Sequence, residues 1–123
     1  MTVARPARLL LVDDEAQILT ALCRSLRREG YELVTAQTPR EALERLAEQT
    51  FDAVVSDHKM PGMTGVELLE KVAHLQPAAA RLLITGWSRA VSAEDRTAAD
   101  LDAVLTKPWE DAELKDALRK ALG

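Results

Sequence analysis

Five polar residues stand at or directly after the ends of apolar runs, and they carry the chemistry that this sequence offers. They are Asp13, Asp14, Asp57, Thr85 and Lys107. Carboxylates that lie close together raise one another's pKa, and a divalent cation with oxygen ligands, such as Mg2+, relieves that repulsion. A carboxylate can also attack phosphorus, and an ammonium offsets charge on the transferring phosphoryl group. The set therefore predicts phosphoryl transfer to a carboxylate beside Mg2+. Thr85 would donate a hydrogen bond to a phosphoryl oxygen, and Gly86 leaves space for the incoming group.

The elements that must position these residues are five expected strands, each followed by a helical pattern. The strands are expected at 9–12, 31–35, 51–55, 81–85 and 101–106. The run 31–35 alternates between apolar and polar residues, which is typical of an edge strand, whereas 9–12 does not alternate and is expected to be buried on both faces. Thr38 and Thr64 each precede a helix and have Glu three residues later, the pattern of a capping box. Gly30 is expected to end the first helix.

Five strand–helix units in strict alternation predict an α/β fold, in which right-handed crossovers join a parallel sheet with helices on both faces. Ligands of such sheets bind beyond the carboxyl ends of the strands. Each polar residue has a structural explanation when taken alone; Asp13 and Asp14, for example, would favour the start of a helix. Their shared position at four strand ends favours a functional site instead.

The bulk properties describe one ordinary domain. The chain has 123 residues, 47% of them hydrophobic and 29% charged, and a net charge of −4. The negative charge gives no reason to expect direct nucleic-acid binding. The single Cys23 excludes an internal disulfide and the common cysteine-rich zinc sites. No signal peptide and no apolar run long enough for a membrane span are visible. We expect a single domain over residues 1–123, in the cytoplasm and without a membrane partner.

Four motifs, in this order, identify a family. They are Leu-Leu-Val-Asp13-Asp14-Glu, Val-Val-Ser-Asp57-His-Lys-Met-Pro-Gly-Met-Thr-Gly, Leu-Leu-Ile-Thr85-Gly and Leu-Thr-Lys107-Pro108-Trp. On these residues the sequence resembles the receiver domains of two-component response regulators along essentially its whole length. The resemblance implies a flavodoxin-like, doubly wound sheet of five strands in the order 2-1-3-4-5, with five helices.

The resemblance also implies roles for single residues. Asp57 would accept a phosphoryl group from a histidine kinase or a phosphotransfer protein. Mg2+ would be held by Asp13, Asp14, Asp57 and the backbone carbonyl of Lys59. Thr85 and Lys107 would contact the phosphoryl group, and the Lys107–Pro108 peptide bond would be cis.

One position departs from the family pattern. Val104 lies three residues before Lys107, where the family often has an aromatic ring that turns inward on activation. The readout through the fourth helix, fifth strand and fifth helix is therefore in doubt, although the chemistry at Asp57 is not. Lys59 and Trp87 would border the path of the water that hydrolyses the phosphoryl group, with Trp87 as a lid or as an anchor for a partner.

The output of the protein is left open by the sequence. Its Thr-Gly-Trp and Lys-Pro-Trp motifs resemble those of receivers that precede cyclic-di-GMP phosphodiesterase or sensor-kinase modules. The chain would be a stand-alone receiver or a separated domain, able to form a homodimer on phosphorylation. It is expected to catalyse only its own phosphorylation and dephosphorylation.

Three other functions compete with this interpretation. A phosphatase of the haloacid dehalogenase type needs an acid two residues after its nucleophile. Lys59 stands there after Asp57, although Glu15 follows Asp13 at that spacing. A flavodoxin-like cofactor binder needs a phosphate loop rich in Ser, Thr and Gly, whereas the acids after the first strand would repel a phosphate. A scaffold that is never phosphorylated would be expected to lack an acid or Lys107, and the sequence retains them all.

Overall fold

The alternation of strands and helices expected from the sequence is confirmed along the chain. The computed structural model describes residues 5–87 and 91–123. Its elements are β1 (Arg8–Val12), α1 (Ala16–Leu26), β2 (Glu32–Ala36), α2 (Pro39–Glu48), β3 (Ala53–Asp57), α3 (Gly65–Leu75), β4 (Ala80–Thr85), α4 (Ala93–Ala98), β5 (Ala103–Thr106) and α5 (Asp111–Leu122). Part of the loop expected between 86 and 91 falls on residues 88–90, which lie outside the described residues.

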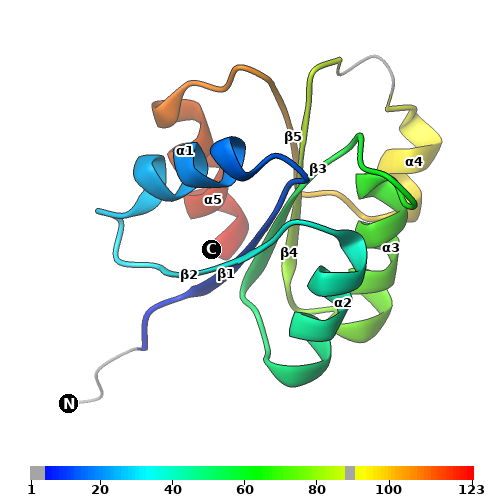
Figure 1. Cartoon of the computed structure of the whole chain (residues 1–123), viewed down its shortest axis with the longest axis horizontal. Helices are drawn as coiled ribbons and strands as arrows, with labels where there is room; N and C mark the ends of the chain where they lie inside the picture. Colours follow the sequence, from blue (N-terminus) through cyan, green and yellow to red (C-terminus); the bar gives the residue numbers. More distant parts are fainter. Residues whose placement is uncertain (1–4, 88–90) are drawn as a thin grey trace.

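The five strands form one parallel sheet in the order β2-β1-β3-β4-β5, as the resemblance implied. Figure 1 shows α1 and α5 on one face of this sheet and α2, α3 and α4 on the other. Strand β2 lies at one edge and is only partly buried, in agreement with its alternating pattern. Strands β3 and β4 are buried at every position, because helices cover both faces of the sheet there.

Alternate residues of β1 supply the two cores. Leu9 and Leu11 pack into the cluster beneath α1 and α5. Leu10 and Val12 pack into the cluster beneath α2 and α3. All four side chains are fully buried, which explains why this strand has no polar alternation. Burial of such side chains on both faces stabilises the sheet by roughly 1.5–3 kcal/mol each.

Helix starts follow the predicted capping pattern at one site and a variant of it at another. Thr64 accepts a hydrogen bond from the Glu67 N–H, and the Glu67 carboxylate accepts one from the Thr64 N–H, so that the capping box is complete. Thr38 also accepts from the Glu41 N–H, but the Glu41 carboxylate reaches the N–H of Gln37 instead of that of Thr38.

The prediction that Gly30 ends the first helix is wrong by about one turn. Helix α1 ends at Leu26 with Arg27 as its C-cap, and the Glu29 N–H donates to the Leu26 carbonyl. Gly30 lies in the following turn with a φ of 82°. The reason is tertiary: Leu26 is fully buried, and the chain must reverse soon after it for Glu32 to pair with Arg8.

Helix α4 differs from the other helices because it spans six residues and none of them is buried. Its neighbours Val91 and Ala99 are buried instead and join the core beneath α3. In the described parts of the chain, no helix has the length and the apolar content needed to cross a bilayer.

Candidate functional site

The sheet brings the predicted polar residues to one edge. Asp13 directly follows β1, Asp57 ends β3, Thr85 ends β4 and Lys107 directly follows β5. The strand register aligns these ends, because Asp57 pairs with Ile84, the residue before Thr85. The convergence predicted from strand ends is thus observed.

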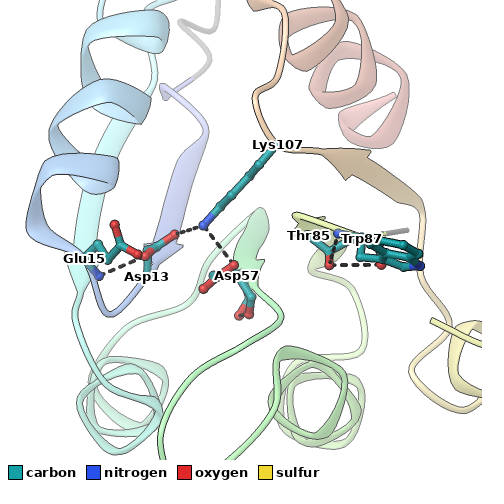
Figure 2. A network of polar contacts seen from close by, with 7 residues as sticks. Asp13, Glu15, Asp57, Thr85, Trp87 and Lys107 are labelled. Carbon is teal, nitrogen blue, oxygen red and sulfur yellow. Dashed lines mark hydrogen bonds and ion pairs between the residues drawn. The ribbon is translucent and has the colours of Figure 1, made fainter. Parts of the chain in front are cut away.

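Lys107 lies between two carboxylates. Its Nζ atom is 2.9 Å from Asp13 Oδ2 and 3.0 Å from Asp57 Oδ1, and Figure 2 shows it extending from the end of β5 into the space between them. Both acids are nearly inaccessible to solvent, Asp13 at 1% exposed and Asp57 at 7%. One ammonium therefore offsets part of the charge of two buried acids, which would otherwise be strongly disfavoured.

The pKa values of Asp57 and Lys107 are both raised, but for different reasons. Burial raises the pKa of Asp57; the hydrogen bond from Lys107 acts against this shift, and the charge of Asp13 adds to it. For Lys107, burial alone would lower the pKa, but its hydrogen bonds and charge interactions with Asp13 and Asp57 outweigh burial and the pKa is raised. Lys107 therefore remains a cation at neutral pH.

Three carboxylates are placed to share a cation. Asp13, Asp14 and Asp57 can each present a ligand oxygen within 4.8 Å of the others. The Glu15 N–H donates to Asp13 Oδ1 at 2.9 Å and fixes the orientation of that carboxylate. Asp14 is exposed, which leaves one side of the cluster open to water. A set of oxygen ligands with an open side fits Mg2+, which keeps several of its waters.

A cleft of about 660 Å3 opens beside these carboxylates. Its lining contains the predicted site residues Asp14, Asp57, Lys59, Thr85, Gly86, Trp87 and Lys107, and also Glu15 and His58. The indole of Trp87 is 66% exposed at the rim. The cleft is therefore large enough and polar enough to admit a phosphoryl group between Asp57 and Trp87.

The Thr85 hydroxyl is engaged away from the carboxylates. It accepts a hydrogen bond from the Trp87 N–H at 3.2 Å and lies 3.4 Å from the Trp87 carbonyl oxygen (Figure 2). Among the described residues, these are its hydrogen-bond partners. A hydrogen bond from Thr85 to a group on Asp57 would require the hydroxyl proton to turn away from the Trp87 carbonyl oxygen.

The remaining predicted residues lie around the end of β5. The Lys107–Pro108 peptide bond is cis, as the resemblance implied. Pro108 lines a neighbouring hollow against α1 rather than the cleft itself. Val104 is partly buried in β5, opposite Leu83 of β4.

The sequence matches the response regulator receiver domain family over residues 9–119, which is most of the chain. This chain belongs to that family. Receiver domains of response regulators act in phosphorelay signalling through phosphorylation of an aspartate, and they interact with kinases and output domains. Receivers also bind Mg2+ at an acidic pocket, which corresponds here to the aspartate cluster.

Two curated relatives of this receiver are a transcriptional regulatory protein and a response regulator. The transcriptional regulatory protein GlrR of Escherichia coli is 36% identical over 118 residues, which is 96% of this chain and 26% of GlrR. The response regulator protein FleR of Pseudomonas aeruginosa is 39% identical over 121 residues, which is 95% of this chain and 25% of FleR. The receiver thus spans about a quarter of the length of the curated relatives that it matches.

Solved structures agree with the receiver fold. The signal receiver domain of an HD domain-containing protein from Pseudomonas fluorescens has a TM-score of 0.92 and 35% identity, covering 99% of this chain and 90% of that one. The response regulator protein TrrA from Thermotoga maritima, in complex with Mg2+ and BeF, has a TM-score of 0.85 and 33% identity, covering 94% of this chain and 98% of that one.

Two residues that contact the Asp57 main chain were not predicted as part of the site. Ser56 is fully buried, and its hydroxyl donates to the Asp57 carbonyl at 2.8 Å. Gly65 lies so close to the same carbonyl that a Cβ atom there would be 2.2 Å from its oxygen. The sequence does contain a signal for Gly65, since a glycine directly after the helix cap Thr64 is a poor helix former. Nothing in the sequence marks Ser56.

Proposed function

We propose that this receiver accepts a phosphoryl group on Asp57, from a phosphohistidine of a histidine kinase or a phosphotransfer protein, with Mg2+ bound at the aspartate cluster. The observation that carries the proposal is the position of the Lys107 ammonium between the buried Asp13 and Asp57 carboxylates. Burying two ionised acids costs free energy even when they are paired, and such groups beside an open cleft are typical of a functional site rather than of a purely structural ion pair.

The transfer of the phosphoryl group is a displacement at phosphorus. An Asp57 carboxylate oxygen forms the new bond to phosphorus while the phosphorus–nitrogen bond of the donor histidine breaks, and the departing nitrogen keeps the electron pair. Lys107 pairs with the equatorial phosphoryl oxygens, and Thr85 donates a hydrogen bond to one of them after its hydroxyl proton turns away from the Trp87 carbonyl. The residues that would hold Mg2+ are Asp13, Asp14 and Asp57, with the backbone carbonyl of Lys59. When bound, the ion would offset the negative charge gathered there.

We further propose the domain organisation, the location and the partners of the protein. The chain, residues 1–123, forms one receiver domain in the cytoplasm that catalyses only its own phosphorylation and dephosphorylation. Phosphorylation changes a protein-interaction surface of the domain, and an output protein or domain binds that surface without direct contact to nucleic acid or membrane. The phosphorylated protein can also form a homodimer through this surface. Val104 supplies no aromatic ring to turn inward, so the surface must change by another movement.

Mass spectrometry after incubation with acetyl phosphate tests the acceptor. Wild-type protein with Mg2+ should gain one phosphoryl mass, and removal of Mg2+ with a chelator should prevent the gain. Asp57→Asn should gain none. Asp116→Asn serves as the control, because Asp116 is an exposed acid of α5, and it should be labelled like wild type. Equal labelling of wild type and Asp57→Asn would contradict the proposal, and no labelling of wild type at all would favour a scaffold.

A further inference from the structure

We propose that Gly65 is a positioning residue for phosphoryl transfer and that, together with the Ser56 hydroxyl, it fixes the main chain of the acceptor Asp57. This inference rests on the function proposed above. It assigns a role to the first residue of α3, which lies outside the cleft and contributes no side chain to it.

The contact between α3 and β3 is closer than any side chain allows. A Cβ atom on Gly65 would lie 2.2 Å from the Asp57 carbonyl oxygen, 2.9 Å from its carbonyl carbon and 2.7 Å from Leu83 Cδ1. Distances below 3.0 Å are not found for real Cβ atoms. The Leu83 methyl group can turn aside, whereas the Asp57 carbonyl belongs to the main chain of a buried strand. Only glycine therefore permits this approach.

Hydrogen bonds fix the same stretch of main chain from three sides. The Gly65 N–H donates to the His58 carbonyl at 2.8 Å, and the His58 N–H donates to the Ile84 carbonyl at 3.1 Å. The Ser56 hydroxyl donates to the Asp57 carbonyl at 2.8 Å. The two peptide groups that follow the Asp57 side chain are thus held by α3, by β4 and by β3 itself.

The consequence for chemistry follows from the short distances in the site. Asp57 must keep one carboxylate oxygen 3.0 Å from the Lys107 ammonium and a ligand oxygen within 4.8 Å of those of Asp13 and Asp14. A Cβ on residue 65 would push the Asp57 peptide or the start of α3 by about 1 Å, to reach an ordinary contact. Displacements of about 1 Å reduce rates by as much as about 100-fold, because the reacting atoms lose their alignment.

The variant Gly65→Ala measures how a Cβ atom at this position changes the rate of phosphorylation. Adding Leu83→Val distinguishes that change in rate from a loss of stability. In the double variant Gly65→Ala/Leu83→Val, the overlap with Leu83 Cδ1 is gone, and any melting temperature that returns reports the part of the clash made with that methyl group. The overlap with the Asp57 carbonyl remains. We expect the maximal rate of phosphorylation, at saturating Mg2+ and acetyl phosphate and well below the melting temperature, to stay about 10- to 100-fold below wild type in both variants. Leu83→Val alone should be phosphorylated like wild type.

Thr64→Ala is the matched control for a weakened start of α3, since it removes the cap without adding an atom near Asp57. It should lower the melting temperature and leave the maximal rate per folded molecule unchanged. Ser56→Ala adds no atom either and should slow phosphorylation several-fold. If Gly65→Ala/Leu83→Val fails to fold, Ser56→Ala decides, and an unchanged rate there would overturn the inference.

The outcomes distinguish this inference from the function on which it rests. Wild-type protein that is never labelled would defeat both. Wild-type labelling at Asp57 together with a normal maximal rate in folded Gly65→Ala/Leu83→Val would defeat the positioning role alone. A rate that recovers in step with the melting temperature would mean that Gly65 serves only packing.

Discussion

At the scale of single residues, the site is organised around the ammonium of Lys107. It is the cation paired with both buried carboxylates in the structure, and it would have to share those oxygens with Mg2+. Mg2+ would be held by carboxylates and not by the lysine, so the two cations would have separable roles. The lysine is needed when negative charge builds up on the phosphoryl oxygens.

Lys107→Ala should therefore retain Mg2+ binding, with an affinity equal to or above that of wild type, because one competing cation is gone. Phosphorylation by acetyl phosphate should fall by at least about 10-fold. A Mg2+ titration followed by indole fluorescence measures the first quantity and mass spectrometry over time the second. Lys120→Ala, which removes an exposed cation of α5, is the control. Loss of Mg2+ binding in Lys107→Ala would show that the roles are not separable.

The raised pKa of Asp57 makes the stability of the fold depend on pH. Burial makes the folded protein hold that proton more readily than the unfolded chain does. The stability gained from this is present below the usual pKa of Asp and is lost as pH rises through the raised value. At neutral pH the ionised acid therefore costs the metal-free fold free energy.

Asp57→Asn removes that cost and should raise the melting temperature by a few degrees at pH 7 in a chelator. The advantage should shrink as the pH falls toward about 4, because folded Asp57 takes up its proton as the pH falls through the raised pKa. Mg2+ should stabilise wild type more than the variant, since a ligand of the folded state raises stability by mass action. Thermal melts at both pH values measure this. A metal-free variant that melts below wild type at pH 7 would show that the ion pair with Lys107 outweighs burial.

The Trp87 side chain lies where it can control the access of water to a phosphoryl group on Asp57. Its indole lines the cleft and is largely exposed at the rim, and its main chain holds the Thr85 hydroxyl. Hydrolysis of the phosphoryl group needs a water in line with phosphorus. Lys59, the other residue at that approach, offers no acceptor group that could orient this water.

Trp87→Ala should therefore admit water and speed the loss of the phosphoryl group several-fold, without preventing its gain. The rate is measured by mass spectrometry after removal of the donor. Trp109→Phe is the control for loss of an indole outside the cleft, and it also isolates the fluorescence of Trp87. An unchanged rate of loss in Trp87→Ala would identify the indole as an anchor for a partner protein instead.

At the scale of elements, the sequence predicted strand ends better than helix ends or side-chain contacts. The carboxyl ends of β1, β4 and β5 were placed correctly, because an apolar run stops where a buried strand leaves the core. The end of α1 was misplaced, since Arg27, Arg28 and Glu29 are ordinary helix formers and only the pairing of β2 forces the chain to turn.

Within the site, the residue types and their edge of the sheet were predictable, and their contacts were not. The bond between the Thr85 hydroxyl and the Trp87 main chain depends on the path of the loop. The contact of Gly65 with Asp57 depends on how α3 packs against β3. Both are tertiary features, and local sequence patterns carry little information on either.

The opposite end of the sheet depends on Arg81, a buried cation at the start of β4. Its guanidinium donates to the carbonyls of Ala79 at 2.8 Å, Pro77 at 3.3 Å and Asp100 at 3.2 Å. It also pairs with the Asp100 carboxylate at 3.2 Å, although the Asp100 side chain is 85% exposed. The hydrogen bonds to the three carbonyls, above all the buried one to Ala79, should therefore matter more than the ion pair.

Arg81→Met should lower the free energy of unfolding by about 2–3 kcal/mol, because it leaves carbonyl groups without a donor. Asp100→Asn keeps a residue that tolerates the positive φ of 49° at this position and should cost less than about 1 kcal/mol. Urea denaturation compares the two. Equal losses would mean that the exposed ion pair is the main anchor.

At the scale of the whole molecule, the two ends of the sheet are built for different purposes. The carboxyl ends gather acids around an open cleft, where Mg2+ would add positive charge to that supplied by Lys107. The amino end is closed by Arg81 and by the Asp102 carboxylate, which accepts from the Arg81 N–H at 2.8 Å. The scaffold can therefore stay fixed while the residues around the cleft rearrange.

Helix α4 has a consequence for the motions of this scaffold. None of its six residues is buried, and only Val91 and Ala99 beside it pack into the core. Few apolar contacts must break for it to open, so its unfolding should be local and cost far less than global unfolding. In deuterated water its amide protons should exchange well before those of α3, which buries five residues. Equal exchange rates would mean that the two helices open only together, so that a change at the cleft could not release α4 alone.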